Sequence, residues 1–341
     1  MFSHQMKVKL TDLYVVTSTY KKKANLFCSN KSKKMGNFHS KGKQPEPPPL
    51  LDEPWRKVAW GNNQDILQYV QNYMPANEDI KHLRVLLYGP VGAGKSSFIN
   101  SVNNVIRRRM TIPAAASATT SGKSFTKNYR THRIQIGKGA DKTFYPVVFN
   151  DIMGVEDGKD CGVCPEDIKL AMEGHVKEGY VFNPVAPLSE GDQYYKNKPS
   201  EDDKVHVLVC VLSANAPEIK DSVLQKMSSV RETAADLGIP QMAIITNIDT
   251  ACPETEKDLK NVYRSTYMQD KMKKFSSAIG IPLNCMFPVK NYSYETRLKD
   301  DVDTLIISAL RPMIDFGDDF IENIVEQNVE EVNQGIEDEG R

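Results

Sequence analysis

The sequence predicts an α/β protein, a three-layer fold around a mixed, mostly parallel, six-stranded sheet with one antiparallel edge hairpin strand. From Arg84 onward, apolar stretches of strand length alternate with longer stretches of helical periodicity. That alternation is typical of a sheet covered by helices on both faces. A glycine-rich loop joins the first strand to a helix, and a short link joins the next two strands. These three observations give the expected order of elements.

The first strand and its helix are connected by the segment GPVGAGKSS, residues 89–97. It matches the phosphate-binding loop G-x-x-x-x-G-K-[ST], with an apolar run before it and a helical pattern after it. Glycines let backbone amides point at phosphate oxygens, and the helix N-terminus adds positive partial charge. A glycine-rich turn without a ligand is the alternative. The expected nucleotide contacts are Gly89, Val91, Gly92, Ala93, Gly94, Lys95, Ser96 and Ser97, with Lys95 on the β- and γ-phosphates and the Ser96 hydroxyl on Mg²⁺.

Two strands follow the loop helix, at about residues 129–136 and 144–150, and residues 137–141 connect them. A parallel crossover needs about a dozen residues or more, so this pair must be an antiparallel hairpin. A phosphate loop followed by a hairpin favours GTPase-like domains over nucleotide kinases, whose sheets are strictly parallel. The sequence therefore indicates a P-loop GTPase-like fold.

Three further apolar runs complete the expected sheet, at residues 205–212, 242–245 and 285–289. The first of them is apolar almost throughout, as expected of a strand buried on both faces. Helices are expected between these strands, at about 219–237 and 254–277. A closing helix begins at about 302–310, and Pro312 should interrupt or kink it because proline lacks the amide hydrogen that helix continuation uses.

The chain divides into regions of different composition. Its N-terminal part is rich in lysine and proline, and its C-terminal part is acidic with apolar residues at helical spacing. About fifty residues after the hairpin break the strand–helix alternation; we expect part of them to be helical and the rest to form a mobile switch region. The expected regions are a disordered basic tail with a Pro-rich linker (1–50), a helical lead-in (51–80), a P-loop GTPase-like domain (81–317) with an insert at about 155–203, and an acidic amphipathic tail (318–341).

Composition narrows the function classes. The net charge is zero, and the basic tail lacks the aromatic interleaving or amphipathic stripe that would signal binding to nucleic acid. No run approaches the roughly 18 apolar residues of a membrane span, and no apolar stretch suits a secretory signal, so we expect a cytoplasmic protein. The six cysteines are scattered, as expected of reduced thiols. Cys161 and Cys164 have zinc-knuckle spacing, but no second ligand pair accompanies them.

The third strand ends in DIMG, residues 151–154, a D-x-x-G sequence. At that end of the strand, Asp151 would lie beside the phosphate loop and hold Mg²⁺ through water, while the Gly154 amide would contact the γ-phosphate. Capping of a helix or turn is the alternative role for Asp151. A switch threonine should add a Mg²⁺ ligand, and of the three that precede the second strand, Thr119, Thr120 and Thr126, we expect Thr120.

The fifth strand ends in Thr246-Asn247-Ile248-Asp249, where guanine-specific proteins carry [NT]-K-x-D. The Asp249 carboxylate would accept hydrogen bonds from guanine N1–H and the exocyclic amine, two donors that adenine does not present in that arrangement. Asn247 stands where a lysine stem normally covers the base, so a reduced affinity is expected. Lys290, after the last strand, would lie in a base-contacting loop. An ordinary turn at the strand end is the alternative.

Hydrolysis is less strongly indicated than binding. Many GTPases orient the attacking water with a glutamine directly after D-x-x-G. Here that residue is Val155, whose side chain cannot orient water. Unassisted turnover should therefore be slow, unless another residue, a partner's group or the phosphates supply the missing function.

Several stretches of the sequence match one known family. They are PWRKVAW, LLYGPVGAGKSSFINSV, DIMG, EDI, MEGHVKEGYVFNP, PQ, VKNY and DVDTLIISALRPMIDFGDDF. On these stretches the chain resembles the interferon-induced protein 44 family over about residues 52–320. The resemblance implies a GTP-binding, GTPase-like domain in a cytoplasmic protein induced during the interferon and antiviral response. Two residues depart from the general GTPase pattern: Ile152 replaces a threonine within D-x-x-G, and Asn247 replaces the lysine.

The sequence thus predicts a switch-like protein that binds GTP or GDP with Mg²⁺ and hydrolyses GTP slowly or conditionally, with a role in innate immunity. A protein partner is expected to bind through the insert or the acidic C-terminal stretch. The alternative is a non-catalytic interaction or scaffold protein that retains the GTPase-like fold.

Overall fold

A single six-stranded sheet forms the centre of the computed structural model, which describes residues 50–61, 63–111, 126–137 and 139–339, with side chains up to residue 324. The strand order is β2-β3-β1-β4-β5-β6. β2 and β3 pair antiparallel, and the other neighbours pair parallel. The predicted α/β fold with an antiparallel hairpin strand at one edge is therefore confirmed. The strands are β1 (Leu83–Tyr88), β2 (Arg130–Ile136), β3 (Thr143–Asp151), β4 (Val207–Ser213), β5 (Gln241–Thr246) and β6 (Met286–Pro288).

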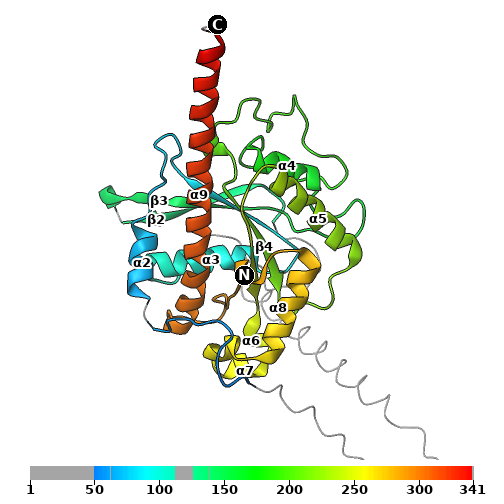
Figure 1. The fold of residues 1–341 in the computed structure, drawn as a ribbon. Helices are drawn as coiled ribbons and strands as arrows, with labels where there is room; N and C mark the ends of the chain where they lie inside the picture. Colours follow the sequence, from blue (N-terminus) through cyan, green and yellow to red (C-terminus); the bar gives the residue numbers. More distant parts are fainter. Residues whose placement is uncertain (1–49, 62, 112–125, 138, 340–341) are drawn as a thin grey trace, which may run out of the picture. The chain divides into compact units, whose positions relative to one another are not determined.

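Helices cover both faces of this sheet (Figure 1). On one face α3 and α9 pack together, and α2 packs against α9. On the other face α5 packs against α4 and α8. Right-handed crossovers explain the division, because the strand order changes direction at β1. The helices are α2 (Gln64–Gln71), α3 (Lys95–Arg107), α4 (Pro165–Met172), α5 (Asp221–Asp236), α6 (Ile248–Ala251), α7 (Pro253–Lys257), α8 (Thr266–Ile279) and α9 (Asp300–Glu339).

The core lies on both sides of the two central strands. Every residue of β1 is buried, and so is every residue of β4 except Ser213. Strands that are buried on both faces read as continuous apolar runs, which is why this part of the sheet was recognisable in the sequence. Helix α9 lies close against the sheet at Gly317, where a Cβ would lie 2.7 Å from the Val207 side chain and 2.8 Å from that of Leu83.

Of the two outcomes expected at Pro312, the interruption of the helix is wrong, and the kink stays a prediction. Helix α9 runs unbroken from Asp300 to Glu339 with Pro312 inside it. The residues on either side of the proline, 309–310 and 313–314, are fully buried. Packing of this apolar stripe stabilises the helix on both sides of the missing hydrogen bond, since tertiary contacts supply most of a helix's stability in a protein.

The single helix expected at 254–277 is also wrong. Three shorter segments take its place: α7, a 3₁₀ turn (Leu259–Tyr263) and α8. Two side chains cap the N-termini of the second and third of these segments. Asp258 accepts a hydrogen bond from the Lys260 amide at 3.0 Å, and Ser265 Oγ accepts one from the Met268 amide at 3.2 Å. Both are N-caps, which end one segment and begin the next.

The insert between β3 and β4 contains α4, the helix expected there, and a 3₁₀ turn (Glu201–Asp203). The chain after α4 runs beside the residues that precede β2, where Tyr129 donates to the Tyr180 carbonyl at 2.8 Å and Phe182 to the Lys127 carbonyl at 3.0 Å. Buried Asp167 accepts from the Leu188 amide at 2.7 Å, and burial raises the pKa of its carboxyl. The insert is thus tied to the edge of the sheet by backbone hydrogen bonds.

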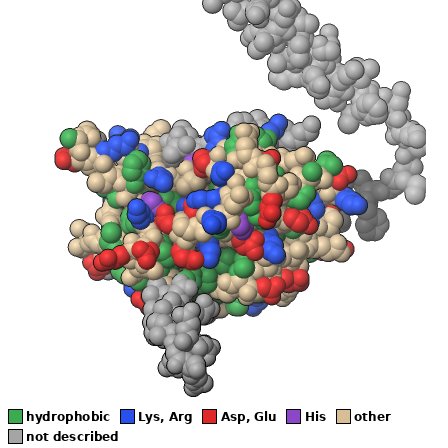
Figure 2. Space-filling view, turned by 90° about the horizontal axis from the view of Figure 1, so that it is seen from above, with side chains coloured by type: hydrophobic (Ala, Val, Ile, Leu, Met, Phe, Trp, Pro, Cys, Tyr) green, Lys and Arg blue, Asp and Glu red, His purple; other side chains and the backbone are tan. Residues whose placement is uncertain are grey.

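The described surface carries both signs of charge. On the face shown in Figure 2, Lys and Arg side chains are interspersed with Asp and Glu, with hydrophobic side chains between them. Within the described ranges, none of the helices has the length and apolar character needed to cross a membrane.

Candidate nucleotide site

The loop between β1 and α3 turns on three glycines with positive φ: 140° at Gly89, 75° at Gly92 and 93° at Gly94. A Cβ on Gly89 would lie 2.2 Å from the carbonyl oxygen of Val211 in β4. Only glycine therefore lets the loop leave β1 so close to the neighbouring strand. The result is a tight loop that leads directly into the N-terminus of α3, as an anion-binding cradle requires.

Lys95 opens α3 and folds back over this loop. Its ammonium donates to the carbonyl oxygens of Gly89 at 3.1 Å and Pro90 at 3.2 Å. The side chain is buried, and burial lowers its pKa, while the nearby charge of Asp151 opposes that shift. A cation is thus held at the cradle, where phosphate oxygens could replace the two carbonyls as its partners.

Three oxygen-bearing side chains converge beside the cradle. Ser96 Oγ donates to Asp151 Oδ2 at 2.5 Å, and Thr126 Oγ1 donates to the same oxygen at 3.2 Å. Asp151 Oδ1 is buried and has no hydrogen-bond partner among the described residues. Hydroxyl and carboxylate oxygens are the ligands that Mg²⁺ prefers, usually together with water and substrate phosphates. The orphaned carboxylate oxygen and this donor set fit a Mg²⁺ ion bound together with a nucleotide.

The structure brings Thr126 to this cluster, and its hydroxyl lies 3.5 Å from Ser96 Oγ. The sequence-based choice, Thr120, falls within 112–125, outside the described residues. Sequence spacing alone could not decide which of these two threonines is the Mg²⁺ ligand, since both precede β2 and neither belongs to a recognisable motif.

The D-x-x-G segment lies directly on the phosphate loop. A Cβ on Gly154 would be 2.5 Å from the Val91 side chain and 2.9 Å from the Val91 backbone nitrogen, so this contact requires glycine. The next residue, Val155, is buried and donates its amide hydrogen to the Gly89 carbonyl at 3.0 Å. D-x-x-G and the cradle therefore form one continuous surface.

Residues 156–161, which follow D-x-x-G, are held by α5. The Lys226 ammonium donates to the carbonyl oxygens of Glu156 at 3.1 Å and of Gly158 and Cys161 at 2.8 Å each. Lys220 pairs with Asp157 at 2.6 Å. Sequence reasoning missed Lys226, because a lysine that caps loop carbonyls belongs to no motif. This part of the expected mobile switch has a defined position against α5.

The end of β5 also contacts the cradle. Thr246 Oγ1 lies 2.6 Å from the Ala93 carbonyl oxygen, to which it can donate. Asn247 adopts the left-handed conformation, with φ of 55°, and its side-chain amide donates a hydrogen bond to Ser213 Oγ at 2.8 Å. The left-handed residue turns the chain at the strand end, so that Asp249 follows in the first turn of α6.

Asp249 and Lys290 meet across the gap between α6 and the segment after β6. Lys290 Nζ lies 3.2 Å from Asp249 Oδ2 and 3.0 Å from Glu295 Oε1. The same ammonium lies 5.0 Å from the centroid of the Tyr294 ring. The two residues predicted to contact the base are therefore neighbours, and two residues absent from the sequence-based prediction, Tyr294 and Glu295, join them.

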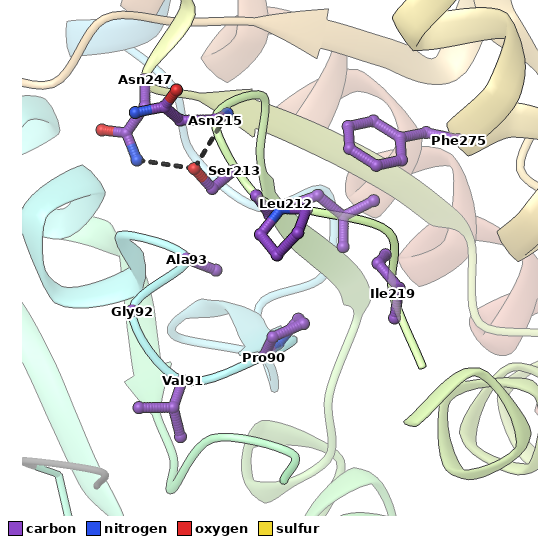
Figure 3. Close-up of a pocket in the computed structure, with 12 residues that line it drawn as sticks. Pro90, Val91, Gly92, Ala93, Leu212, Ser213, Asn215, Ile219, Asn247 and Phe275 are labelled. Carbon is purple, nitrogen blue, oxygen red and sulfur yellow. Dashed lines mark hydrogen bonds between the residues drawn. The ribbon is translucent and has the colours of Figure 1, made fainter. Parts of the chain in front are cut away.

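A pocket of about 320 Å³ adjoins the phosphate loop on the side of β4 (Figure 3). Loop residues 90–93 form one wall, and Ile219 and Phe275 form an apolar wall opposite. Asn247 and Ser213 are hydrogen-bonded to each other at the rim. Neither Ser96 nor the base-edge carboxylate lines this pocket, so it neighbours the candidate nucleotide site without containing its metal ligands.

Sequence comparison identifies relatives of the chain. It is 31% identical over 287 residues to interferon-induced protein 44 of Pan troglodytes. The identity and the matched length are the same for interferon-induced protein 44 of Homo sapiens. It is 30% identical over 260 residues to interferon-induced protein 44-like of Homo sapiens. These matches take in 84%, 84% and 76% of the chain. The chain belongs to the interferon-induced protein 44 family.

The chain spans 64% of the length of the interferon-induced protein 44 relatives and 57% of the 44-like relative. No family model matches it. Among solved structures it is similar to Toc33 from Arabidopsis thaliana, as a dimerization-deficient mutant (TM-score 0.44, 14% identity, 76% of this chain and 93% of that one). A second Toc33 structure, with GDP and Mg²⁺, gives a TM-score of 0.43 at 13% identity, again over 76% and 93% of the two chains. The family assignment rests on the sequence relatives.

Two of the stretches that resemble the interferon-induced protein 44 family form hydrogen bonds that position elements around the candidate site. In PWRKVAW, the Arg56 guanidinium donates to the Met286 and Leu283 carbonyls at 2.7 and 2.6 Å, which fixes the start of β6. In VKNY, Asn291 donates to the Gly94 carbonyl at 3.2 Å, and the Tyr292 amide donates to Ser101 Oγ at 3.0 Å. These contacts hold the segment that carries Lys290 against α3 and the phosphate loop.

The other predicted nucleotide contacts of this family member lie in or next to the phosphate loop. Gly92 and Ala93 line the pocket of Figure 3, and Ser97 lies in the first turn of α3, where its carbonyl accepts from Ser101 Oγ at 2.8 Å. The structure thus brings the predicted phosphate, metal and base residues that it describes to the carboxyl ends of the parallel strands; Thr120 lies outside the described residues.

Proposed function

We propose that this chain is a switch-like protein that binds GTP or GDP together with Mg²⁺. The observation that carries the proposal is the convergence of Lys95, Ser96 and Asp151 at the cradle, with Asp249 in α6, directly after the end of β5 that contacts the cradle. Lys95 and the loop amides would bind phosphate oxygens. Ser96, Asp151 and Thr126 would hold Mg²⁺, which neutralises phosphate charge when bound. Asp249 would accept the two guanine donors.

Turnover of GTP by this site should be slow or conditional. Val155 occupies the position after D-x-x-G where many GTPases carry the glutamine that orients water. Its side chain is buried, and its amide is already bonded to the Gly89 carbonyl. An aliphatic group in that position neither donates nor accepts a hydrogen bond, so it supplies nothing to an attacking water.

The biological setting is also part of the proposal. The names of the relatives support an interferon-induced role. We extend this proposal to the antiviral response. We place the protein in the cytoplasm and expect a protein partner at the insert or at the acidic C-terminal stretch. The insert presents two exposed valines to such a partner, Val181 and Val185.

A titration of the purified chain with GTP, GDP and ATP, each with and without Mg²⁺, tests the binding proposal. GTP and GDP should bind more tightly than ATP, and Mg²⁺ should strengthen the binding of GTP. Lys95→Ala should remove all nucleotide binding, because it deletes the cation at the cradle. Equal affinities for GTP and ATP would contradict the guanine part of the proposal.

A non-catalytic interaction protein on the same fold is the second candidate, and buried Val155 is the observation that favours it. The release of phosphate from GTP separates the two functions. A slow GTPase releases phosphate faster than its Lys95→Ala variant does. Equal release by the two proteins would assign the chain to the non-catalytic class.

A further inference from the structure

Lys290 stands between two carboxylates of different surroundings. Asp249 belongs to α6, and its side chain is 17% exposed; Glu295 lies five residues after Lys290, and its side chain is 2% exposed. The ammonium is within 3.2 Å of the first and 3.0 Å of the second. The Tyr294 ring, 75% exposed, flanks it with its hydroxyl 3.3 Å from Nζ. The Lys290 ammonium therefore forms ion pairs with both Asp249 and Glu295.

Lys290 and Glu295 are both charged at neutral pH. Burial alone would lower the pKa of Lys290, but its bonds to Glu295 and Tyr294 and the charge of Asp249 raise it above its ordinary value. Burial alone would raise the pKa of Glu295, but the hydrogen bond from the Ser293 amide and the ion pair with Lys290 outweigh it and lower that pKa. Lys290 thus stays positive and Glu295 negative.

In this arrangement Lys290 competes with a base for the Asp249 carboxylate. A carboxylate that reads guanine must offer its oxygens to N1–H and to the exocyclic amine. Here one of those oxygens, Oδ2, faces the ammonium of Lys290. A buried negative partner for the same lysine already exists in Glu295, so release from Asp249 need not leave the cation unpaired, a costly outcome for a buried charge.

We propose that Lys290 is a latch on Asp249 and that Glu295 is the positioning residue that takes the latch over when guanine binds. The inference rests on the proposed guanine-nucleotide function. Without nucleotide, Lys290 neutralises both carboxylates. With guanine present, the base donors replace Lys290 at Asp249, and Glu295 with the Tyr294 ring retains the ammonium. Glu295 thereby sets how readily Asp249 becomes available.

Glu295→Gln tests the latch, because it removes the competing charge while keeping the shape of the side chain. Lys290 is then left with Asp249 as its charged partner in this cluster, so guanine must compete against a stronger pair. The affinity for GTP should fall about tenfold, the factor that about 1.4 kcal/mol produces. The affinity for ATP, which does not use Asp249, should be unchanged. The ratio of GTP to ITP affinity should also fall, because ITP lacks the exocyclic amine.

The double variant Lys290→Met/Glu295→Gln should restore GTP affinity, since no latch remains. Glu254→Gln is the matched control: it removes the same charge from a pair with Lys257 at 2.8 Å, and GTP affinity should not change. If Glu295→Gln proves unfolded by thermal denaturation, the double variant, in which residues 290 and 295 are both uncharged, is compared directly with the wild type and should bind GTP at least as tightly.

Two results would overturn the latch. One is an unchanged GTP to ITP ratio in Glu295→Gln. The other is a double variant that binds GTP as weakly as Glu295→Gln does or, where that single variant is unfolded, more weakly than the wild type. Failure of the proposed function looks different. In that case the wild type itself binds GTP no better than ATP, and Asp249→Ala changes neither affinity.

Discussion

Ser96 and Asp151, fifty-five positions apart in the chain, are joined by a hydrogen bond of 2.5 Å between Oγ and Oδ2. Ser96 lies in the first turn of α3, and Asp151 is the last residue of β3. Parallel pairing of β1 with β3 brings the two ends together, because Leu87 is opposite Asp151 in the register. In the proposed site, Ser96 and Asp151 would hold Mg²⁺ next to the nucleotide phosphates.

Ser96→Ala should make GTP binding insensitive to Mg²⁺. The hydroxyl is the ligand that links the cradle to the metal, whereas the backbone amides that bind phosphate remain in place. The measurement is GTP affinity with Mg²⁺ and with a chelator. We expect a clear strengthening by Mg²⁺ in the wild type and none in the variant. A variant that retains the full Mg²⁺ effect would remove Ser96 from the metal site.

Thr126→Val should weaken Mg²⁺-dependent GTP binding, whereas Thr120→Val should leave it intact. The reason is the 3.2 Å contact of the Thr126 hydroxyl with Asp151. Valine keeps the size of threonine and removes only the oxygen. Parallel titrations of the two variants distinguish the structural assignment from the sequence-based one. A loss confined to Thr120→Val would reverse the assignment.

Lys226→Met should loosen the segment that follows D-x-x-G. The ammonium donates to three loop carbonyls, and hydrogen bonds to a charged group contribute about 1.5–3 kcal/mol. Hydrogen exchange of amides 155–163 should accelerate about tenfold or more, while exchange in β1 stays unchanged. Lys220→Met is the control, since its exposed pair with Asp157 should matter much less. Equal protection in all three proteins would contradict the role of Lys226.

Buried His206 should make the fold sensitive to acid. Its Nδ1 accepts from the Arg84 amide at 2.9 Å, which requires a neutral ring, and burial lowers its pKa from 6.5 to about 4. Between those values the unfolded chain binds a proton that the folded chain does not, so stability falls as pH decreases. The loss from this group is roughly 3 kcal/mol between neutral pH and pH 4.

Urea denaturation at several pH values checks this expectation. The wild type and His206→Gln should differ in the slope of stability against pH between about 6.5 and 4, with the shallower slope in the variant. Parallel slopes would show that other groups account for the acid sensitivity.

Local patterns explain what could be predicted from the sequence. The phosphate loop is a run of adjacent residues, and the short link 137–141 leaves the hairpin no other geometry. Asp151 was predictable because a motif at a strand end maps to one edge of a parallel sheet. The same reasoning assigned both Asp249 and Lys290 to the base, and in the structure Lys290 Nζ lies 3.2 Å from Asp249 Oδ2.

Contacts between distant segments explain what could not be predicted. Lys226 and Glu295 act through side chains that no spacing rule connects to the loop or to the base edge. Pro312 was misjudged because helix propensity was weighed without the packing that stabilises α9 on both sides of it. The caps Asp258 and Ser265 were read as helix interior, although both residue types also begin helices.

The most direct test of guanine recognition is the nucleotide preference of Asp249→Asn. Xanthine carries a carbonyl where guanine carries the exocyclic amine, so an asparagine amide can donate where the aspartate could only accept. Affinities for GTP, XTP and ATP should be measured for the wild type and the variant. We expect GTP to bind tightest to the wild type and XTP to the variant, with ATP weak in both. An unchanged order of affinities in Asp249→Asn would contradict the assignment of Asp249 as the residue that reads the base.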